Sequence, residues 1–285
     1  MLKLHGIPTD YNYTFKSQIT WLLGIFVSII CIISLDTAIS DIKFYGTIPK
    51  ICLLIHVMYT TVFQFVTDLT FNNFLRYLRN RLQCVNKLIP NILFKRHPQL
   101  INAANSEKIQ VYLITDIREI HYSICSMASE YNTTIGIQIL LSMTNSFLNS
   151  LSQLFKLYVM FVLMDSCPYN STGALHSYCF LHKLIRAMPL VLFSTKIFLT
   201  IHTCVATSYE ANRTGQLLAE LQIATTNGHE KFRREIDIFL LQLIQNPLRF
   251  TAYEFFVLDF TTIHRMIGTV TTLLLLQVQM DDIHE

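Results

Sequence analysis

The side chains that could hold a metal ion or move a proton form no recognisable constellation in this chain. The ten histidines are scattered. His121 and Cys125 stand one helical turn apart, but on an amphipathic face this spacing favours packing over a metal site. The chain contains none of the short motifs of phosphate-binding loops, serine hydrolases or zinc proteases. These observations predict that the protein is not an enzyme and uses neither cofactor nor metal.

Three other ionisable side chains stand inside long apolar runs: His56, Asp68 and Lys196. Such groups are costly in hydrocarbon and therefore turn toward protein or toward a water-filled cavity. For His56 and Asp68 we favour a structural role over a ligand or ion site. Lys196 lies near the middle of its run, where an unpaired ammonium is expensive, so we expect it to face the interior of a helix bundle or a cavity.

The composition is typical of a membrane protein. Of the 285 residues, 52% are hydrophobic and only 14% are charged, whereas soluble domains contain about 25% charged residues. The mean hydropathy is +0.39. The net charge of +3 is too small to indicate a nucleic-acid partner. No apolar run precedes Ile19, so no signal peptide is predicted. The seven cysteines contain no CxxC pair and do not suggest a disulfide framework.

The hydropathy pattern predicts an all-α, polytopic membrane protein with a single domain. Five runs are apolar enough to serve as transmembrane helices, at residues 19–35, 51–69, 133–164, 180–205 and 255–280. Residues 1–17 are polar and read as a cytoplasmic segment. Apolar residues also recur at helical spacing, with basic residues between them, in two amphipathic stretches that we expect to be cytoplasmic helices, at residues 71–130 and 206–250.

Basic residues concentrate in these two amphipathic stretches, which the positive-inside rule therefore places in the cytoplasm. The N-terminus is then inside and the C-terminus outside. The loop after residue 164 is predicted to be extracellular. It contains a glycosylation acceptor, Asn170, and two cysteines that an oxidising environment would allow to pair, Cys167 and Cys179. Three further acceptor sequences fall on the predicted inside and are interpreted as chance matches, at Asn12, Asn132 and Asn212.

The last apolar run ends in polar residues. Gln277 and Gln279 stand near its outer end, where they either lie at the membrane interface or line a pore. Position alone leaves both interpretations open.

The tail of the chain is similar to the C-terminal signature of the insect gustatory receptors, which reads Thr-Tyr, five apolar residues and Gln-Phe. Thr272 and Gln279 match its Thr and Gln, while Leu273 replaces the Tyr and Met280 the Phe. Three more segments resemble the family in the same order. They are the stretch from Ile117, residues 204–218 (CVATSYEANRTGQLL) and residues 250–260 (FTAYEFFVLDF).

The resemblance implies a tastant-gated cation channel of sensory-neuron dendrites, formed by four identical or related subunits around the last helix. It implies pore or gate roles for Thr272, Leu276, Gln277, Gln279 and Met280, and leaves the ligand-binding residues unknown. The cytoplasmic helices would anchor the subunits to one another. The family has seven membrane helices, so the five spans align with its third to seventh, and the chain resembles an N-terminally truncated member.

Three alternatives stay open on the sequence. The chain could be a receptor that signals through a cytoplasmic partner, although its orientation is not that of G-protein-coupled receptors. It could be a modifier subunit that assembles with full-length receptors. It could also be an inactive fragment. Neither the tastant nor the subunit partners can be read from the residues.

Overall fold

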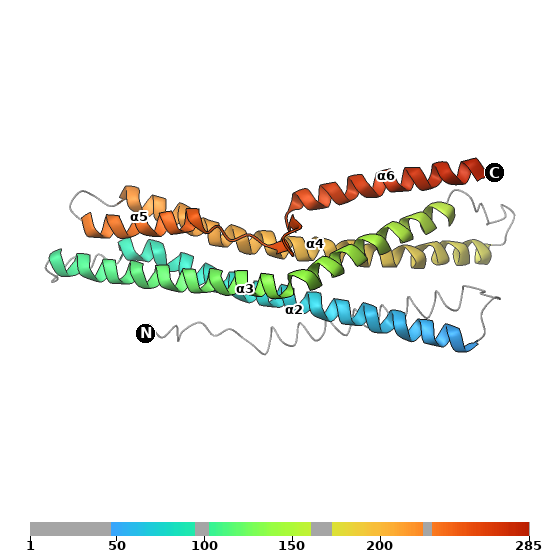
Figure 1. Cartoon of the computed structure of the whole chain (residues 1–285), viewed down its shortest axis with the longest axis horizontal. Helices are drawn as coiled ribbons and strands as arrows, with labels where there is room; N and C mark the ends of the chain where they lie inside the picture. The colour runs from blue at the N-terminus through green and yellow to red at the C-terminus, as the bar shows by residue number, and fades with distance from the viewer. Residues whose placement is uncertain (1–46, 95–102, 161–172, 225–229, 285) are drawn as a thin grey trace. The chain divides into compact units, whose positions relative to one another are not determined.

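The part of the chain that the structure describes is almost entirely helical. The computed structural model describes residues 47–94, 103–160, 173–224 and 230–284. Three long helices, α2 (Thr47–Phe94), α3 (Ala103–Tyr158) and α4 (Gly173–Ala224), precede the shorter α5 (Glu230–Gln245). A small antiparallel hairpin of β1 (Thr251–Ala252) and β2 (Phe256–Val257) then leads into the last helix, α6 (Phe260–His284) (Figure 1). The predicted all-α class is therefore correct apart from this hairpin.

The chain divides into two compact units. Unit 1 comprises Met1–Thr67 and Ser152–Leu192, and unit 2 comprises Asp68–Leu151 and Phe193–Glu285. The helices α2, α3 and α4 contribute residues to both. Within unit 1, Tyr59 stacks on Phe63, and the hydroxyl of Thr67 donates a 3.0 Å hydrogen bond to the Phe63 carbonyl. Unit 2 contains the features that the following sections use.

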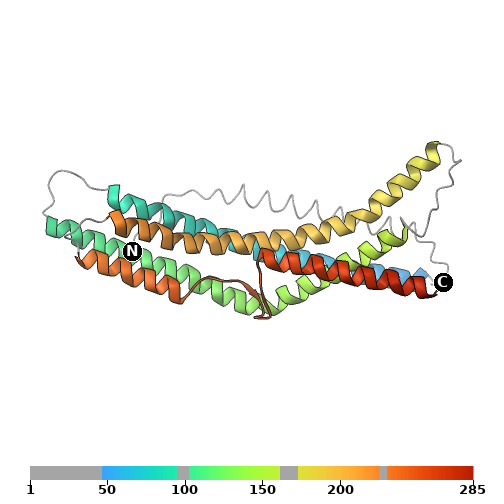
Figure 2. The same ribbon diagram turned by 90° about the horizontal axis from the view of Figure 1, so that it is seen from above.

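One half of unit 2 is a four-helix core. In both views α5 lies beside the first part of α3 (Figures 1 and 2). Buried apolar side chains from α2, α3, α4 and α5 meet there, namely Val85, Ile89, Ile114, Ile117, Leu218, Leu221, Phe232, Ile236 and Phe239. These residues come from the amphipathic stretches named from the sequence. Their apolar faces are therefore buried against one another, which is how an amphipathic helix gains most of its stability.

A second core cluster joins α2, α3 and α4 to the hairpin segment. It includes Phe71, Leu75, Ile139, Ile201 and Cys204 from the helices, all almost fully buried. The chain after α5 contributes Leu248, Phe250, Ala252 and Leu258 to the same cluster. The hairpin thus belongs to the packed body of unit 2 and is not a loose connection.

The start of the last helix differs from the prediction. The sequence places a helix from residue 255, but α6 begins at Phe260. Tyr253 and Glu254 adopt positive φ angles of 49° and 62° and reverse the chain between β1 and β2. The apolar run FFVLDF is therefore divided between strand and helix. Hydropathy does not distinguish the two, because Phe256 and Leu258 pack into the core in either case.

Two other boundaries also differ. Proline usually ends a helix, so the sequence predicts a loop at Pro90, yet α2 continues through it to Phe94. The amphipathic stretch 206–250 is not one helix: its first part continues α4 to Ala224, and its second part forms α5 from Glu230. The predicted first span, 19–35, and the segment 1–17 lie outside the described residues.

Among the described residues, one helical stretch, Ala187–Ala224, is both long enough and apolar enough to cross a membrane. The five-span count stays a prediction.

The contact between α3 and the hairpin generates a prediction about two glycines. A Cβ atom on Gly136 would lie 3.2 Å from the backbone nitrogen of Tyr253, whereas one on Gly215 would lie 3.7 Å from a Leu243 methyl group. Replacing a glycine inside a helix by alanine stabilises the helix by about 1 kcal/mol. We expect Gly215→Ala to raise the thermal midpoint of the purified protein. Gly136→Ala should not, because the hairpin backbone must move away.

The measurement is thermal unfolding in detergent, followed by size-exclusion chromatography of the heated samples. An equal increase for both variants would show that the hairpin does not depend on close contact with α3.

Candidate functional site

The residues with predicted pore or gate roles lie on α6, which is the most exposed helix of unit 2. Only Thr262 is buried among the α6 residues whose side chains are described. Ile263 and Met266 pack against the core near its first turns. Further along, large apolar side chains are exposed, with exposed fractions of 58% for Ile267, 57% for Leu275 and 62% for Met280. An apolar helix with so little cover needs lipid or another protein chain around it.

Four of the five predicted pore residues share one face of α6. Leu276 follows Thr272 by four residues, and Gln279 and Met280 follow Leu276 by three and four, as residues on one side of a helix do. All four are exposed. Gln277 stands about 100° around the helix from Leu276. It therefore lies on the side of the helix that carries Met266.

The threonines of α6 satisfy their own hydrogen bonds. The hydroxyl groups of Thr269, Thr271 and Thr272 donate to the carbonyls of Arg265, Ile267 and Gly268, at 2.9, 2.9 and 3.0 Å. A hydroxyl bonded within its own helix can face lipid at little cost. These threonines therefore do not require a water-filled environment. The exposed glutamines are stronger evidence that water borders this helix.

The direction of α6 is fixed at its first residue. Asp259 precedes the helix, and its Oδ1 accepts hydrogen bonds from the Thr261 hydroxyl at 2.6 Å and from the Thr262 backbone nitrogen at 3.1 Å. This is N-terminal capping by an aspartate, which is worth about 1 kcal/mol. The Thr262 hydroxyl donates to the Val257 carbonyl at 2.7 Å and so ties the helix to the hairpin.

A second candidate site is a seam of buried polar residues between α2 and α4. On α4 its members recur every three or four residues and are all buried: Lys196, Thr200, Thr203, Thr207, Glu210 and Thr214. Their partners on α2 follow in the same order, since the two helices run parallel. Asn72 donates to the Thr200 hydroxyl at 3.4 Å, and the Thr207 hydroxyl donates to the Leu75 carbonyl at 3.4 Å.

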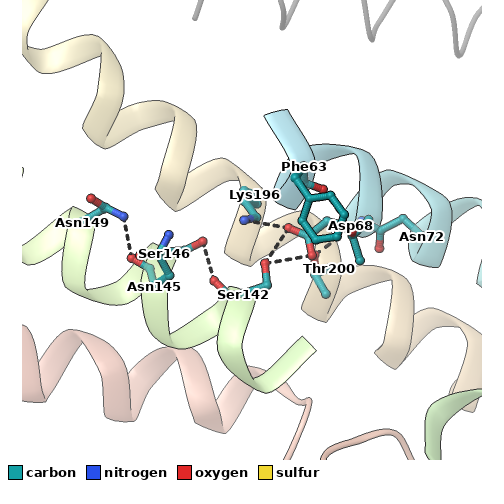
Figure 3. Close-up of polar contacts among 10 residues, drawn as sticks. Phe63, Asp68, Asn72, Ser142, Asn145, Ser146, Asn149, Lys196 and Thr200 are labelled. Atoms are coloured by element: carbon teal, nitrogen blue, oxygen red, sulfur yellow. Dashed lines mark hydrogen bonds and ion pairs between the residues drawn. The ribbon is translucent and has the colours of Figure 1, made fainter. Parts of the chain in front are cut away.

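One end of the seam is an ion pair in which three helices meet (Figure 3). The ammonium of Lys196 on α4 lies 2.7 Å from Oδ2 of Asp68 on α2, and the two side chains are only 5% and 6% exposed. Ser142 on α3 donates to the same carboxylate, 2.9 Å from each oxygen. The predicted interior position of Lys196 and the structural role of Asp68 thus share one explanation, because each provides the counter-charge that the other needs when buried.

The other end of the seam is centred on Glu210. Its carboxylate accepts hydrogen bonds from Gln83 and Asn86, both at 3.2 Å, and Asn86 also donates to the Glu210 carbonyl at 2.9 Å. The Thr214 hydroxyl donates to Oδ1 of Asn86 at 2.6 Å. Arg213 approaches the carboxylate at 3.6 Å from the exposed side. Glu210, Ala211, Thr214 and Gly215 are the positions that resemble the receptor family, and here they form the surface of α4 that faces its neighbours.

His121 and Cys125 pack inside the four-helix core. His121 is 3% exposed and makes an edge contact with Phe239 of α5. The sulfur of Cys125 lies 3.7 Å from its Nδ1. Burial lowers the pKa of His121 to about 4, against the opposing effect of a hydrogen bond to the Ala211 backbone. Burial also raises the pKa of the Cys125 thiol to about 12. A neutral imidazole and a protonated thiol suit packing, as the sequence predicted.

The remaining predicted sites are placed as follows. Cys167 and Asn170 lie outside the described residues, as does the side chain of Cys179. Asn132 donates to the Thr251 hydroxyl at 3.3 Å and so attaches the hairpin to α3. Among the described residues, no group of three histidine, cysteine or acidic side chains could hold a metal ion.

This architecture is that of the insect chemosensory receptors. The chain matches the model of the 7tm chemosensory receptor family over residues 4–284 and therefore belongs to that family. The solved structure of the insect olfactory receptor OR5 from Machilis hrabei, in complex with eugenol, shares the fold. The TM-score is 0.59 at 14% identity, over 98% of this chain and 71% of that chain.

Two curated relatives from Drosophila melanogaster are gustatory receptors. Gustatory and pheromone receptor 32a is 30% identical over 108 residues, which cover 38% of this chain and 21% of that receptor. Gustatory receptor 68a is 33% identical over 82 residues, which cover 29% of this chain and 20% of that receptor. The matched segments thus span about a fifth of these relatives. The resemblance drawn from the sequence to this receptor group is confirmed at the level of the family.

The buried histidine generates a prediction about pH. The pKa of His121 is about 4 in the folded protein and 6.5 as a free side chain. Between these values the unfolded chain binds more protons, so stability is complete above pH 6.5 and falls as the pH decreases toward 4. The loss approaches about 3 kcal/mol at the lower limit. We expect His121→Phe to weaken this dependence, as measured by the thermal midpoint between pH 7.5 and 5.

The exposed His202 provides the control. His202→Gln should keep the wild-type pH dependence. If His121→Phe behaved like His202→Gln, the acid sensitivity would have to come from other groups.

Proposed function

We propose that the chain is a subunit of a tastant-gated cation channel, with the stripe of Thr272, Leu276, Gln279 and Met280 on α6 facing a central pore. The single observation that carries the proposal is the exposure of α6. This helix is capped at its start, but it packs against the core only near its first turns. Its exposed apolar side chains therefore need to be covered by other molecules.

The two sides of α6 suit different surroundings. The stripe ends in an amide and a thioether, Gln279 and Met280, whereas the opposite side presents aliphatic Ile267. In a ring of subunits, the first side can border water and the second side lipid or a neighbouring helix. Four copies of Met280 would form a hydrophobic constriction that can close by excluding water. Gln277 lies outside this stripe, so we assign it no direct part in the constriction.

We further propose that the chain crosses the membrane several times, in the plasma membrane of sensory neurons, with the four-helix core in the cytoplasm. The basic residues of this core support that orientation, since cytoplasmic segments are enriched in Lys and Arg. α3 and α5 carry an interhelical ion pair there, Arg118–Glu235 at 3.0 Å. Exposed apolar residues of α5, among them Leu241 and Ile244, would form part of the contact between subunits.

The relatives support a small-molecule ligand of the taste or pheromone type. The named Drosophila relatives are gustatory receptors, one of them also a pheromone receptor, and the OR5 structure contains eugenol. A subunit that conducts only together with other receptors is the alternative. Expression of this chain alone and together with a gustatory receptor relative separates the two, because only an autonomous channel gives current alone.

The pore proposal predicts distinct effects of substitutions on the two sides of α6. Met280→Ala should increase ligand-independent current, because the constriction loses its bulk. Gln279→Ala should change rectification or ion selectivity, because a polar ring is removed. The measurement is whole-cell current in cells that express the receptor, with surface expression quantified for each variant.

Ile267→Ala is the matched control, since Ile267 is 58% exposed on the opposite side of the same helix. It should leave conductance and selectivity unchanged. If Gln279→Ala and Met280→Ala changed no more than Ile267→Ala does, the stripe would not line the pore.

A further inference from the structure

The forces that hold α2, α3 and α4 together change along unit 2. Over most of the unit the three helices share apolar cores. Within unit 2, the buried apolar residues end at Phe71 on α2, Met143 on α3 and Ile201 on α4, although Phe65 of α2, in unit 1, is also buried. Beyond these positions, every buried side chain that the structure describes in unit 2 is polar: Asp68, Ser146, Ser150, Lys196 and Thr200.

The serine hydroxyl groups of α3 beyond Ser142 add little cohesion between helices. The Ser146 hydroxyl donates at 2.8 Å to the Ser142 carbonyl of its own helix. Among the described residues, the Ser150 hydroxyl and Oδ1 of Asn72 have no hydrogen-bond partner, although both residues are more than nine-tenths buried. Incompletely satisfied polar groups favour separation of the surfaces that bury them, since water would satisfy them.

The ion pair is a strong contact between helices at this end. Lys196 and Asp68 join α4 to α2, and Ser142 joins α3 to the same carboxylate. Asp68 is the first residue of unit 2 on α2, and Lys196 stands one turn after α4 enters the unit at Phe193. The pair therefore lies at the end of the unit, where the fully buried apolar residues have ended and the partly buried Ile197 still packs against the core.

We propose that Asp68, Ser142 and Lys196 form a latch that holds the three helices together in the resting receptor and opens when the receptor is activated. Only the second part of this inference, the opening on activation, rests on the proposed channel function. A buried ion pair suits such a role, because its attraction depends steeply on distance and solvation. A small displacement that admits water weakens the pair, whereas apolar contacts a few turns away persist.

The test uses the double variant Asp68→Asn with Lys196→Met. It removes both charges together, so neither single charge is left buried alone, and the fold is expected to survive. A cysteine placed at Ser146, which is 0% exposed, reports on opening through its rate of modification by a membrane-permeant maleimide. Peptide mass spectrometry measures this rate separately from those of the native cysteines.

We expect the Ser146→Cys thiol to react on the order of tenfold faster in the double variant than with the ion pair intact, as local opening without global unfolding would produce. Native Cys204, 1% exposed in the apolar core, should stay protected in both. The charge exchange Asp68→Lys with Lys196→Asp should restore protection. The matched control removes a different ion pair between helices, by Arg118→Met with Glu235→Gln, and should leave the rate unchanged.

Ligand-independent cation current is recorded on the same variants. It should rise several-fold in the double variant and fall back to the wild-type level in the charge-exchange variant. If modification of Ser146→Cys were faster but neither the variants nor the wild type carried current, the channel function would be contradicted and the latch would still be supported. Unchanged modification of Ser146→Cys in the double variant would overturn the latch. Faster modification of Cys204 as well would also overturn it, because the whole unit would then have loosened.

Discussion

Buried polar groups must find partners, and this constraint determines how the helices of unit 2 are aligned. Once Lys196 lies inside the bundle, a carboxylate has to lie within reach, and Asp68 meets that requirement at 2.7 Å. Glu210, about four turns further along α4, imposes a similar requirement on Gln83 and Asn86. Two fixed points on the same pair of helices define their register, because a shift at either point would leave a charge buried without its partner.

The apolar cores supply cohesion but less specificity. Leucine, isoleucine and phenylalanine side chains can pack in several arrangements, whereas a hydrogen bond fails when donor and acceptor move apart by about 1 Å. The Thr214–Asn86 bond therefore positions α4 against α2, and the Asn132–Thr251 bond positions the hairpin against α3. Asn132 and Gly136, one turn apart on α3, fix the hairpin at two points, and the hairpin in turn directs α6.

The sequence predicted the helical class, the amphipathic stretches and the interior position of Lys196, because these follow from periodicity and from the cost of an unpaired charge. It did not pair Lys196 with Asp68, which lies 128 positions earlier in the chain. Two helices can be parallel neighbours or not, and a single sequence does not decide between these arrangements. The hairpin was also missed, because it needs two non-glycine residues at positive φ, and Tyr253 and Glu254 give no such signal.

The segments that resemble the receptor family are explained by these same contacts. Glu210 and Thr214 bind α2, while Gly215 lets α4 approach Leu243 of α5. Thr251 and Asp259 secure the hairpin and the cap of α6. Each of these positions connects one helix to the next, and none of them belongs to the exposed stripe of α6. These positions therefore specify a scaffold that aims the last helix, whereas the tail matches, Thr272 and Gln279, lie on the exposed stripe itself. What that helix does is decided by the side chains on its exposed face, where Met280 departs from the family signature.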